Sequence, residues 1–159
     1  KVKNLHTGKP GGIMVLASSE ILNSSMLKTI CRETYGSSNL CKDILPFGGT
    51  DIHNGMPDIS KPQFLITATP DQYHLRPQDQ WSLGILIDSL RRNNELSMYF
   101  DKVSEEFLLD YGVIAAVYVR NREIPADVTD YLSHRYVSGS KQENRNMLPM
   151  EPYCENTIY

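Results

Sequence analysis

Hydroxyl-bearing residues and glycines stand at or near the ends of apolar runs, where they could meet an anionic ligand. The candidates are Ser18, Ser19, Gly48, Gly49, Thr50 and Thr69. A hydroxyl or a backbone N–H can donate a hydrogen bond to a phosphate oxygen and so hold a nucleic-acid backbone without reading its bases. The Gly48-Gly49 pair is also typical of a simple turn, and that alternative stays open.

Charged pairs further along the chain lack the pattern that phosphate-transfer chemistry needs. Asp101 is followed by Lys102, whose positive charge would repel a magnesium ion. Gly8-Lys9 runs into a proline and lacks the spacing of a phosphate loop. The pair His134-Arg135 has no further arginine beside it. We therefore expect no catalytic residue, no bound metal and no cofactor.

The elements that would position these residues alternate between strands and helices. Strand-like apolar runs cover Ile13–Ala17, Ile44–Phe47, Phe64–Thr69 and Val113–Val119. Helical spacing of apolar residues covers Leu22–Cys31, Trp81–Arg92, Glu95–Tyr111 and Pro125–Leu132. Such alternation predicts an α/β fold with a parallel sheet and helices on both faces. Ser18 or Ser19 is expected to cap the first helix, and Gly36 to end it.

Length and charge limit the classes of protein that fit. The 159 residues, 40% of them apolar, are enough for one core. We expect a single domain over residues 1–136 and a partly ordered tail over 137–159. The net charge of -3 argues against a broad nucleic-acid surface, which is usually basic.

The three cysteines, Cys31, Cys41 and Cys154, are odd in number and form no Cys-x-x-Cys pair. This pattern predicts free thiols and a reducing, intracellular environment. No apolar run approaches the roughly 18 residues that a membrane helix needs, so no membrane contact is expected.

The ordered motifs resemble the first lobe of DEAD-box and related superfamily 2 RNA helicases over residues 10–140. Ala17–Leu22 stands where that family has Pro-Thr-Arg-Glu-Leu-Ala, Gly48–Thr50 where it has Gly-Gly, and Thr69–Gln72 where it has Thr-Pro-Gly-Arg. Phe100–Ser104 falls at Asp-Glu-Ala-Asp, and Val117–Val119 falls at Ser-Ala-Thr. The resemblance implies a RecA-like domain whose motif positions Asp101 and Lys102 are degenerate.

A second register is equally open. Ile124–Tyr131 followed by His134 and Arg135 resembles the approach to His-Arg-x-Gly-Arg in the second helicase lobe. In the first register Ser19 and Gln72 replace arginines that contact RNA in the family, so RNA binding is expected to be weak.

The chain is also similar to the Yb-type Tudor-domain helicase-like proteins of the piRNA pathway, which carry modules without some catalytic motifs. That resemblance implies a non-catalytic scaffold in an RNA-processing or RNA-silencing assembly, in cytoplasmic ribonucleoprotein granules. Its partners would be proteins, including itself as a homodimer, with weak single-stranded RNA contact. The alternatives are an RNA-binding module, or one lobe of an ATP-dependent RNA helicase whose phosphate loop lies elsewhere.

Overall fold

A computed structural model of the chain describes residues 11–36, 39–45, 56–75, 80–91 and 95–143, with the backbone alone at 39–40 and 140–143. The strands are β1 (Gly12–Leu16), β2 (Ile44–Leu45), β3 (Pro62–Thr69), β4 (Phe100–Leu108) and β5 (Ile114–Arg120). The helices are α1 (Ser24–Tyr35), α2 (Asn39–Lys42), α3 (Trp81–Arg91) and α4 (Ala126–Glu143). The described part is thus a mixed α/β domain.

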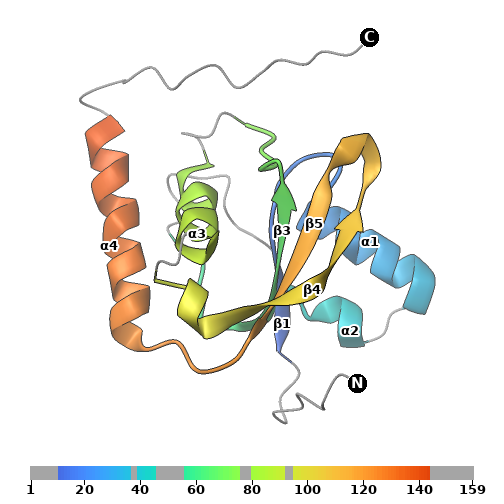
Figure 1. Cartoon of the computed structure of the whole chain (residues 1–159), viewed down its shortest axis with the longest axis horizontal. Helices are drawn as coiled ribbons and strands as arrows, with labels where there is room; N and C mark the ends of the chain where they lie inside the picture. Colours follow the sequence, from blue (N-terminus) through green and yellow to red (C-terminus); the bar gives the residue numbers. More distant parts are fainter. Residues whose placement is uncertain (1–10, 37–38, 46–55, 76–79, 92–94, 144–159) are drawn as a thin grey trace.

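The five strands form one sheet in the order β2-β1-β3-β5-β4, with α3 and α4 on one face and α1 and α2 on the other (Figure 1). β1 shows why both faces need covering. Met14 and Leu16 pack into the cluster that contains α3, whereas Val15 and Ala17 pack into the cluster on the α1 side. The prediction of a central strand with helices on both faces is confirmed.

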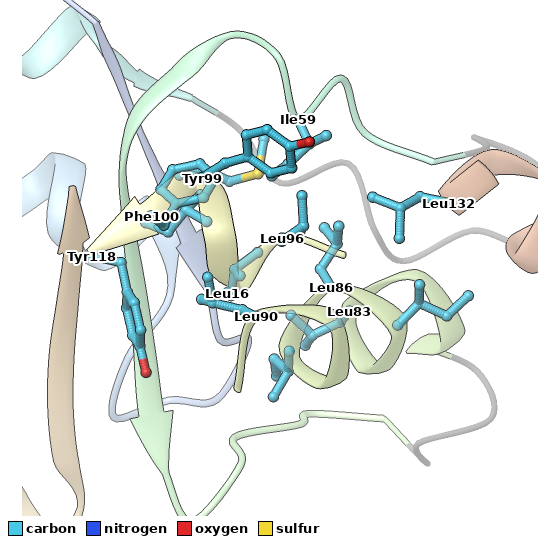
Figure 2. Close-up of a cluster of buried hydrophobic side chains, with 14 of the residues drawn as sticks. Leu16, Ile59, Leu83, Leu86, Leu90, Leu96, Tyr99, Phe100, Tyr118 and Leu132 are labelled. Carbon is cyan, nitrogen blue, oxygen red and sulfur yellow. The ribbon is translucent and has the colours of Figure 1, made fainter. Parts of the chain in front are cut away.

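The larger core lies between the sheet and α3. Figure 2 shows Leu83, Leu86 and Leu90 of α3 facing Leu16 of β1. Leu132 of α4 is fully buried in the same cluster. α4 comes close to α3 at Gly139, where a Cβ would collide with the indole of Trp81. Any larger residue at position 139 would therefore force the Trp81 ring to move.

The sheet is not parallel throughout, which corrects the prediction. β1 runs parallel to β2 and β3, but β5 is antiparallel to both β3 and β4. The chain leaves β3, passes over one face of the sheet through α3, and places β4 two positions from β3. β5 then returns through a tight turn and fills the gap, and a tight turn can only join antiparallel strands.

The helix expected over Glu95–Tyr111 is wrong, because most of that segment is β4. Leu96, Tyr99 and Phe100 are buried at the core edge, but Phe107 is about half exposed. The apolar spacing therefore mimics a helix without building one continuous buried stripe. The backbone of this segment pairs instead with β5 from Phe100 to Leu108, with an irregularity between Lys102 and Glu106.

The ends of the other helices differ from the expected ones in part. Asn23 caps α1, its Oδ1 accepting from Met26 N at 2.7 Å, so Ser18 and Ser19 do not. Gly36 ends α1 with a φ of 66°, as expected. α4 continues to Glu143, so its last turns lie where a tail was expected. No described helix has both the length and the apolar character for a membrane span.

The prediction of free thiols is wrong for two of the three cysteines. Cys31 of α1 and Cys41 of α2 form a disulfide with their Cα atoms 5.6 Å apart. Both are buried beside Ile44, so the bond fastens the two helices to the edge strand β2. Cys154 lies outside the described residues. The inference of a reducing environment rested on free thiols and loses that support.

Breaking this disulfide should destabilise the domain. The bridge closes a sequence separation of 10 residues, for which the loss of unfolded-state entropy corresponds to about 2.5 kcal/mol. Urea unfolding with and without dithiothreitol should show that decrease in the free energy of unfolding. The double variant Cys31→Ala/Cys41→Ala should be insensitive to the reductant. An unchanged midpoint for the wild-type chain would contradict the bond.

Candidate functional site

β1 and β3 are parallel neighbours whose carboxyl ends meet at one edge of the sheet. Leu16 is paired with Thr67, so the residues that follow each strand emerge together. The chain then passes from β1 to α1 on one face and from β3 to α3 on the other (Figure 1). Such a switch in direction is where ligands commonly bind in open α/β sheets.

Ser18 and Gln80 form the centre of a polar network at this end. Ser18 N donates to the carbonyl of Gln72 at 2.9 Å, and Ser18 Oγ lies 2.6 Å from Gln80 Nε2. Gln80 is only 1% exposed, and its Oε1 accepts from the backbone N–H groups of His74 and Leu75 at 3.1 Å each. One buried amide thus fastens the segment after β3 to the segment after β1.

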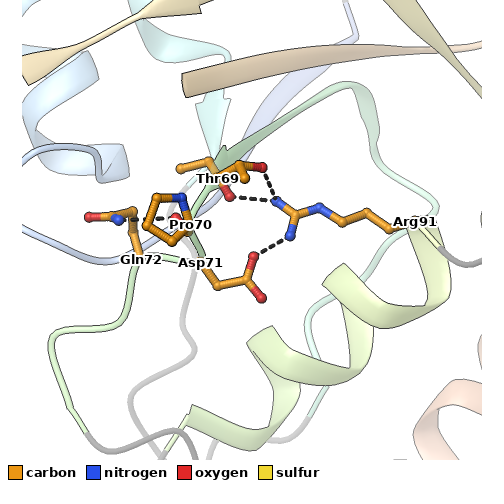
Figure 3. Close-up of polar contacts among 6 residues, drawn as sticks. Thr69, Pro70, Asp71, Gln72 and Arg91 are labelled. Carbon is orange, nitrogen blue, oxygen red and sulfur yellow. Dashed lines mark hydrogen bonds and ion pairs between the residues drawn. The ribbon is translucent and has the colours of Figure 1, made fainter. Parts of the chain in front are cut away.

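Arg91, at the end of α3, holds the other side of the same segment (Figure 3). Its guanidinium donates to the carbonyl of Ala68 and to Thr69 Oγ1, and it forms an ion pair with Asp71. Thr69 is followed by a cis peptide bond to Pro70. The charge of Arg91 is therefore used to hold the start of the segment after β3 against α3.

The hydroxyls expected to contact RNA are used by the chain itself. Ser19 Oγ accepts from the backbone N–H groups of Ile21 and Leu22 at 3.1 and 3.2 Å. Thr69 Oγ1 accepts from Arg91. Because each of these hydroxyls acts as an acceptor, its own proton stays available to donate. Ser18, Ser19 and Thr69 are thus brought to one end, while Gly48, Gly49 and Thr50 lie outside the described residues.

Asp101 and Lys102 lie at the opposite end of the sheet. β4 runs parallel to β3, because both are antiparallel to β5, so the start of β4 lies beside the start of β3. Asp101 accepts from Asn121 Nδ2 at 2.9 Å, and Lys102 donates to Glu106 at 2.5 Å. That hydrogen bond raises the pKa of Lys102. These two residues cannot share a site with Ser18 and Thr69.

His134 and Arg135 lie on α4, where the arginine has a structural role. Arg135 reaches Asp88 at 3.4 Å and Glu95 at 3.5 Å, and its guanidinium also lies 3.4 Å from Ser89 Oγ. It therefore ties α4 to α3 and to the segment that leads into β4. His134 is exposed on the same helix.

The turn between β4 and β5 brings large apolar side chains to the same end of the sheet as Ser18 and Thr69. Thr69 is paired with Ile114, and Ile114 with Leu108. Phe107 is 48% exposed, Leu108 76% and Tyr111 92%. Tyr111 has a φ of 57°, in the left-handed region that disfavours a residue with a side chain. We call Phe107, Leu108 and Tyr111 the hairpin tip.

Exposed carboxylates are sequence neighbours of the hairpin tip. Glu105 and Glu106 precede Phe107, and Asp110 precedes Tyr111, all of them exposed. Lys102 offsets one of them through its bond to Glu106. Phe107 and Leu108 are consecutive residues of β4 and so lie on opposite faces of the hairpin, each with an exposed glutamate two residues before it. Within the described ranges, His, Cys, Asp and Glu side chains form no group of three that could hold a metal.

Sequence reasoning missed three parts of this end of the molecule. Nothing in a single glutamine signals the burial of Gln80. Nothing in the sequence pairs Arg91 with Asp71, because the two residues are 20 positions apart. The hairpin tip lies in the segment Glu95–Tyr111, for which the sequence pattern wrongly predicts a helix.

Comparison of the chain with protein-family models, curated proteins and solved structures finds no match.

Replacing Gln80 should cost more stability than replacing the half-buried Gln72 nearby. Gln80→Met keeps the length of the side chain but removes the Oε1 that accepts from Ser18 Oγ and from the backbone N–H groups of His74 and Leu75. Losing the hydrogen bonds of one buried side chain costs on the order of 1–3 kcal/mol, so we expect about 2 kcal/mol less free energy of unfolding. The control Gln72→Met removes one bond to the Pro70 carbonyl and should cost less than about 1 kcal/mol. Equal effects in urea unfolding would contradict the network.

Proposed function

We propose that this chain is a non-catalytic domain that associates with another protein through the hairpin tip. One observation carries the proposal: Leu108 and Tyr111 are 76% and 92% exposed at the turn of a β-hairpin. Large apolar side chains gathered on a surface commonly mark an interaction site. Burying one such side chain contributes roughly 1.5–3 kcal/mol.

The backbone of Tyr111 adds to this argument. A left-handed conformation costs a residue with a side chain roughly 1–3 kcal/mol, and glycine would avoid that cost. The tyrosine at this position is 92% exposed, so packing within the described part of the chain gives it little compensation. A ring held outward on a strained turn is suited to insertion into a partner.

The exposed carboxylates beside the hairpin tip indicate the chemistry of the partner. Exposed Glu105, Glu106 and Asp110 favour a protein surface with an apolar pocket bordered by lysine or arginine. Two copies of this chain meeting tip to tip would bring like charges together. A homodimer through this surface is therefore the less favoured form of the proposal.

The helicase likeness and the RecA-like descent of the domain stay predictions. A place in cytoplasmic ribonucleoprotein granules also stays a prediction, but the disulfide between Cys31 and Cys41 argues against it. The likeness is supported by motif order, and by Ser18, Ser19 and Thr69 lying at the switch point between β1 and β3. The antiparallel strand β5 departs from the parallel sheet that the helicase likeness implies, and a RecA-like descent would have to account for it. Weak RNA contact would use the hydroxyl groups of Ser19 and Thr69 as hydrogen-bond donors to phosphate. Nearby carboxylates such as Asp71 and Asp110 would oppose this contact by repelling the phosphates.

Site-specific cross-linking tests the association. Benzoylphenylalanine in place of Tyr111 presents a photoreactive ring at the hairpin tip, and the same replacement of Tyr35, 64% exposed on α1, is the control. We expect one identifiable protein adduct at Tyr111 and not at Tyr35, lost when Leu108→Ser is added. Adducts are identified by mass spectrometry. An adduct of two copies of this chain would select the homodimer, and no adduct specific to Tyr111 would overturn the proposal.

Calorimetry tests the RNA and ATP predictions. Without a phosphate loop, a non-hydrolysable ATP analogue should give no heat at micromolar concentration. Single-stranded oligouridylate should bind weakly at low salt and release on addition of salt, because phosphate contacts are electrostatic. Thr69→Val should weaken this binding, whereas Thr34→Val on α1 should not. ATP-analogue binding would restore the helicase-lobe alternative, and the absence of RNA binding at low salt would remove the RNA prediction.

A further inference from the structure

The disulfide between Cys31 and Cys41 has a consequence for where the chain folds. Disulfides of this kind form and persist in oxidising compartments such as the secretory pathway, and are rare in the cytosol. Both sulfurs belong to buried residues in a cluster with Ile44, so the bond is a structural part of the domain. A chain that folds in that compartment meets the enzymes that modify asparagine there.

Asn23-Ser24-Ser25 is the single Asn-x-Ser/Thr triplet of the sequence, and its middle residue is not proline. This triplet is the acceptor pattern for N-linked glycans in secreted proteins. We propose that Asn23 carries an N-linked glycan. The disulfide and the triplet are independent observations: the disulfide indicates the compartment, and the triplet supplies an acceptor that is used there.

The geometry of Asn23 is compatible with this modification. Its Oδ1 caps α1 by accepting from Met26 N at 2.7 Å, and its Nδ2 donates to the carbonyl of Ser19 at 2.8 Å. A glycan replaces one of the two hydrogens on Nδ2. The capping acceptor is untouched, and one hydrogen remains for Ser19. Exposed Glu20 and Ser25 border the position, so the sugar has solvent on that side.

The glycan is transferred to Asn23 from a lipid-linked oligosaccharide donor. A bond forms between Asn23 Nδ2 and the anomeric carbon of an oligosaccharide held on a polyprenyl diphosphate. The bond between that carbon and the phosphate oxygen breaks. Nδ2 releases one proton, and the lipid diphosphate leaves. In the folded chain Asn23 is half-buried, so transfer takes place before the turn into α1 closes.

The test is the occupancy of Asn23 in protein expressed from its own coding sequence in cultured animal cells. Peptide-N-glycosidase digestion in heavy-oxygen water labels each formerly glycosylated asparagine as a heavy aspartate, which mass spectrometry locates. We expect the label at Asn23, together with a non-reduced peptide pair joining Cys31 to Cys41. An unlabelled Asn23 would overturn the proposal, whether the disulfide is present or absent.

Matched variants separate the glycan from the helix cap. Ser25→Ala destroys the triplet but keeps the Asn23 cap, so it should abolish the label while its unfolding midpoint equals that of wild-type protein made without the glycan, which also keeps Asn23. Ser24→Ala keeps the triplet and should keep the label, as should Ser25→Thr. A label that survives Ser25→Ala would contradict the assignment. The association proposal stands apart from this outcome, because its readout is the adduct at Tyr111.

Discussion

The antiparallel pairing of β3 with β5 is the constraint on which the rest of the molecule depends. It joins the parallel part of the sheet to the β4–β5 hairpin along six residue pairs, from Phe64 with Val119 to Thr69 with Ile114. Within this pairing Ala68 lies opposite Ala115, and both are buried in one cluster with Ala17 and Leu22 of the segment that follows β1. Because the register ends at Thr69, the turn of the hairpin must lie at the carboxyl ends of β1 and β3.

That placement gathers several features at one end of the sheet. The network around Gln80 and Arg91 closes the segment after β3, and Leu22 and Leu109 belong to one apolar cluster that joins the approach to α1 with the hairpin. The switch point would by its topology suit a small ligand, to which Ser19 and Thr69 could donate only through hydroxyls that also accept hydrogen bonds from the chain. The exposed surface next to it is apolar and acidic, which suits a protein better than a polyanion.

Much of the fold could be predicted because both faces of β1 are apolar and its neighbours carry the same signal. The boundaries of α3 and the stop at Gly36 also follow from local patterns. Glu95–Tyr111 could not be predicted, since its apolar spacing fits a helix as well as a strand and only the pairing with β5 decides. The bond between Cys31 and Cys41 depends on where α2 places its cysteine. Of the candidate site, the meeting of Ser18, Ser19 and Thr69 follows from strand order, whereas Gln80, Arg91 and the hairpin tip depend on tertiary contacts.

β4 is the edge of the sheet, and almost all of its side chains are exposed on both faces. An edge strand of this length could recruit strands from other molecules and polymerise. The irregular register between Lys102 and Glu106 interrupts the ladder, and the charged residues around it oppose a second backbone. Aggregation is thereby disfavoured along the middle of β4, and the apolar turn beyond it can be displayed without turning the domain into a fibre-forming template.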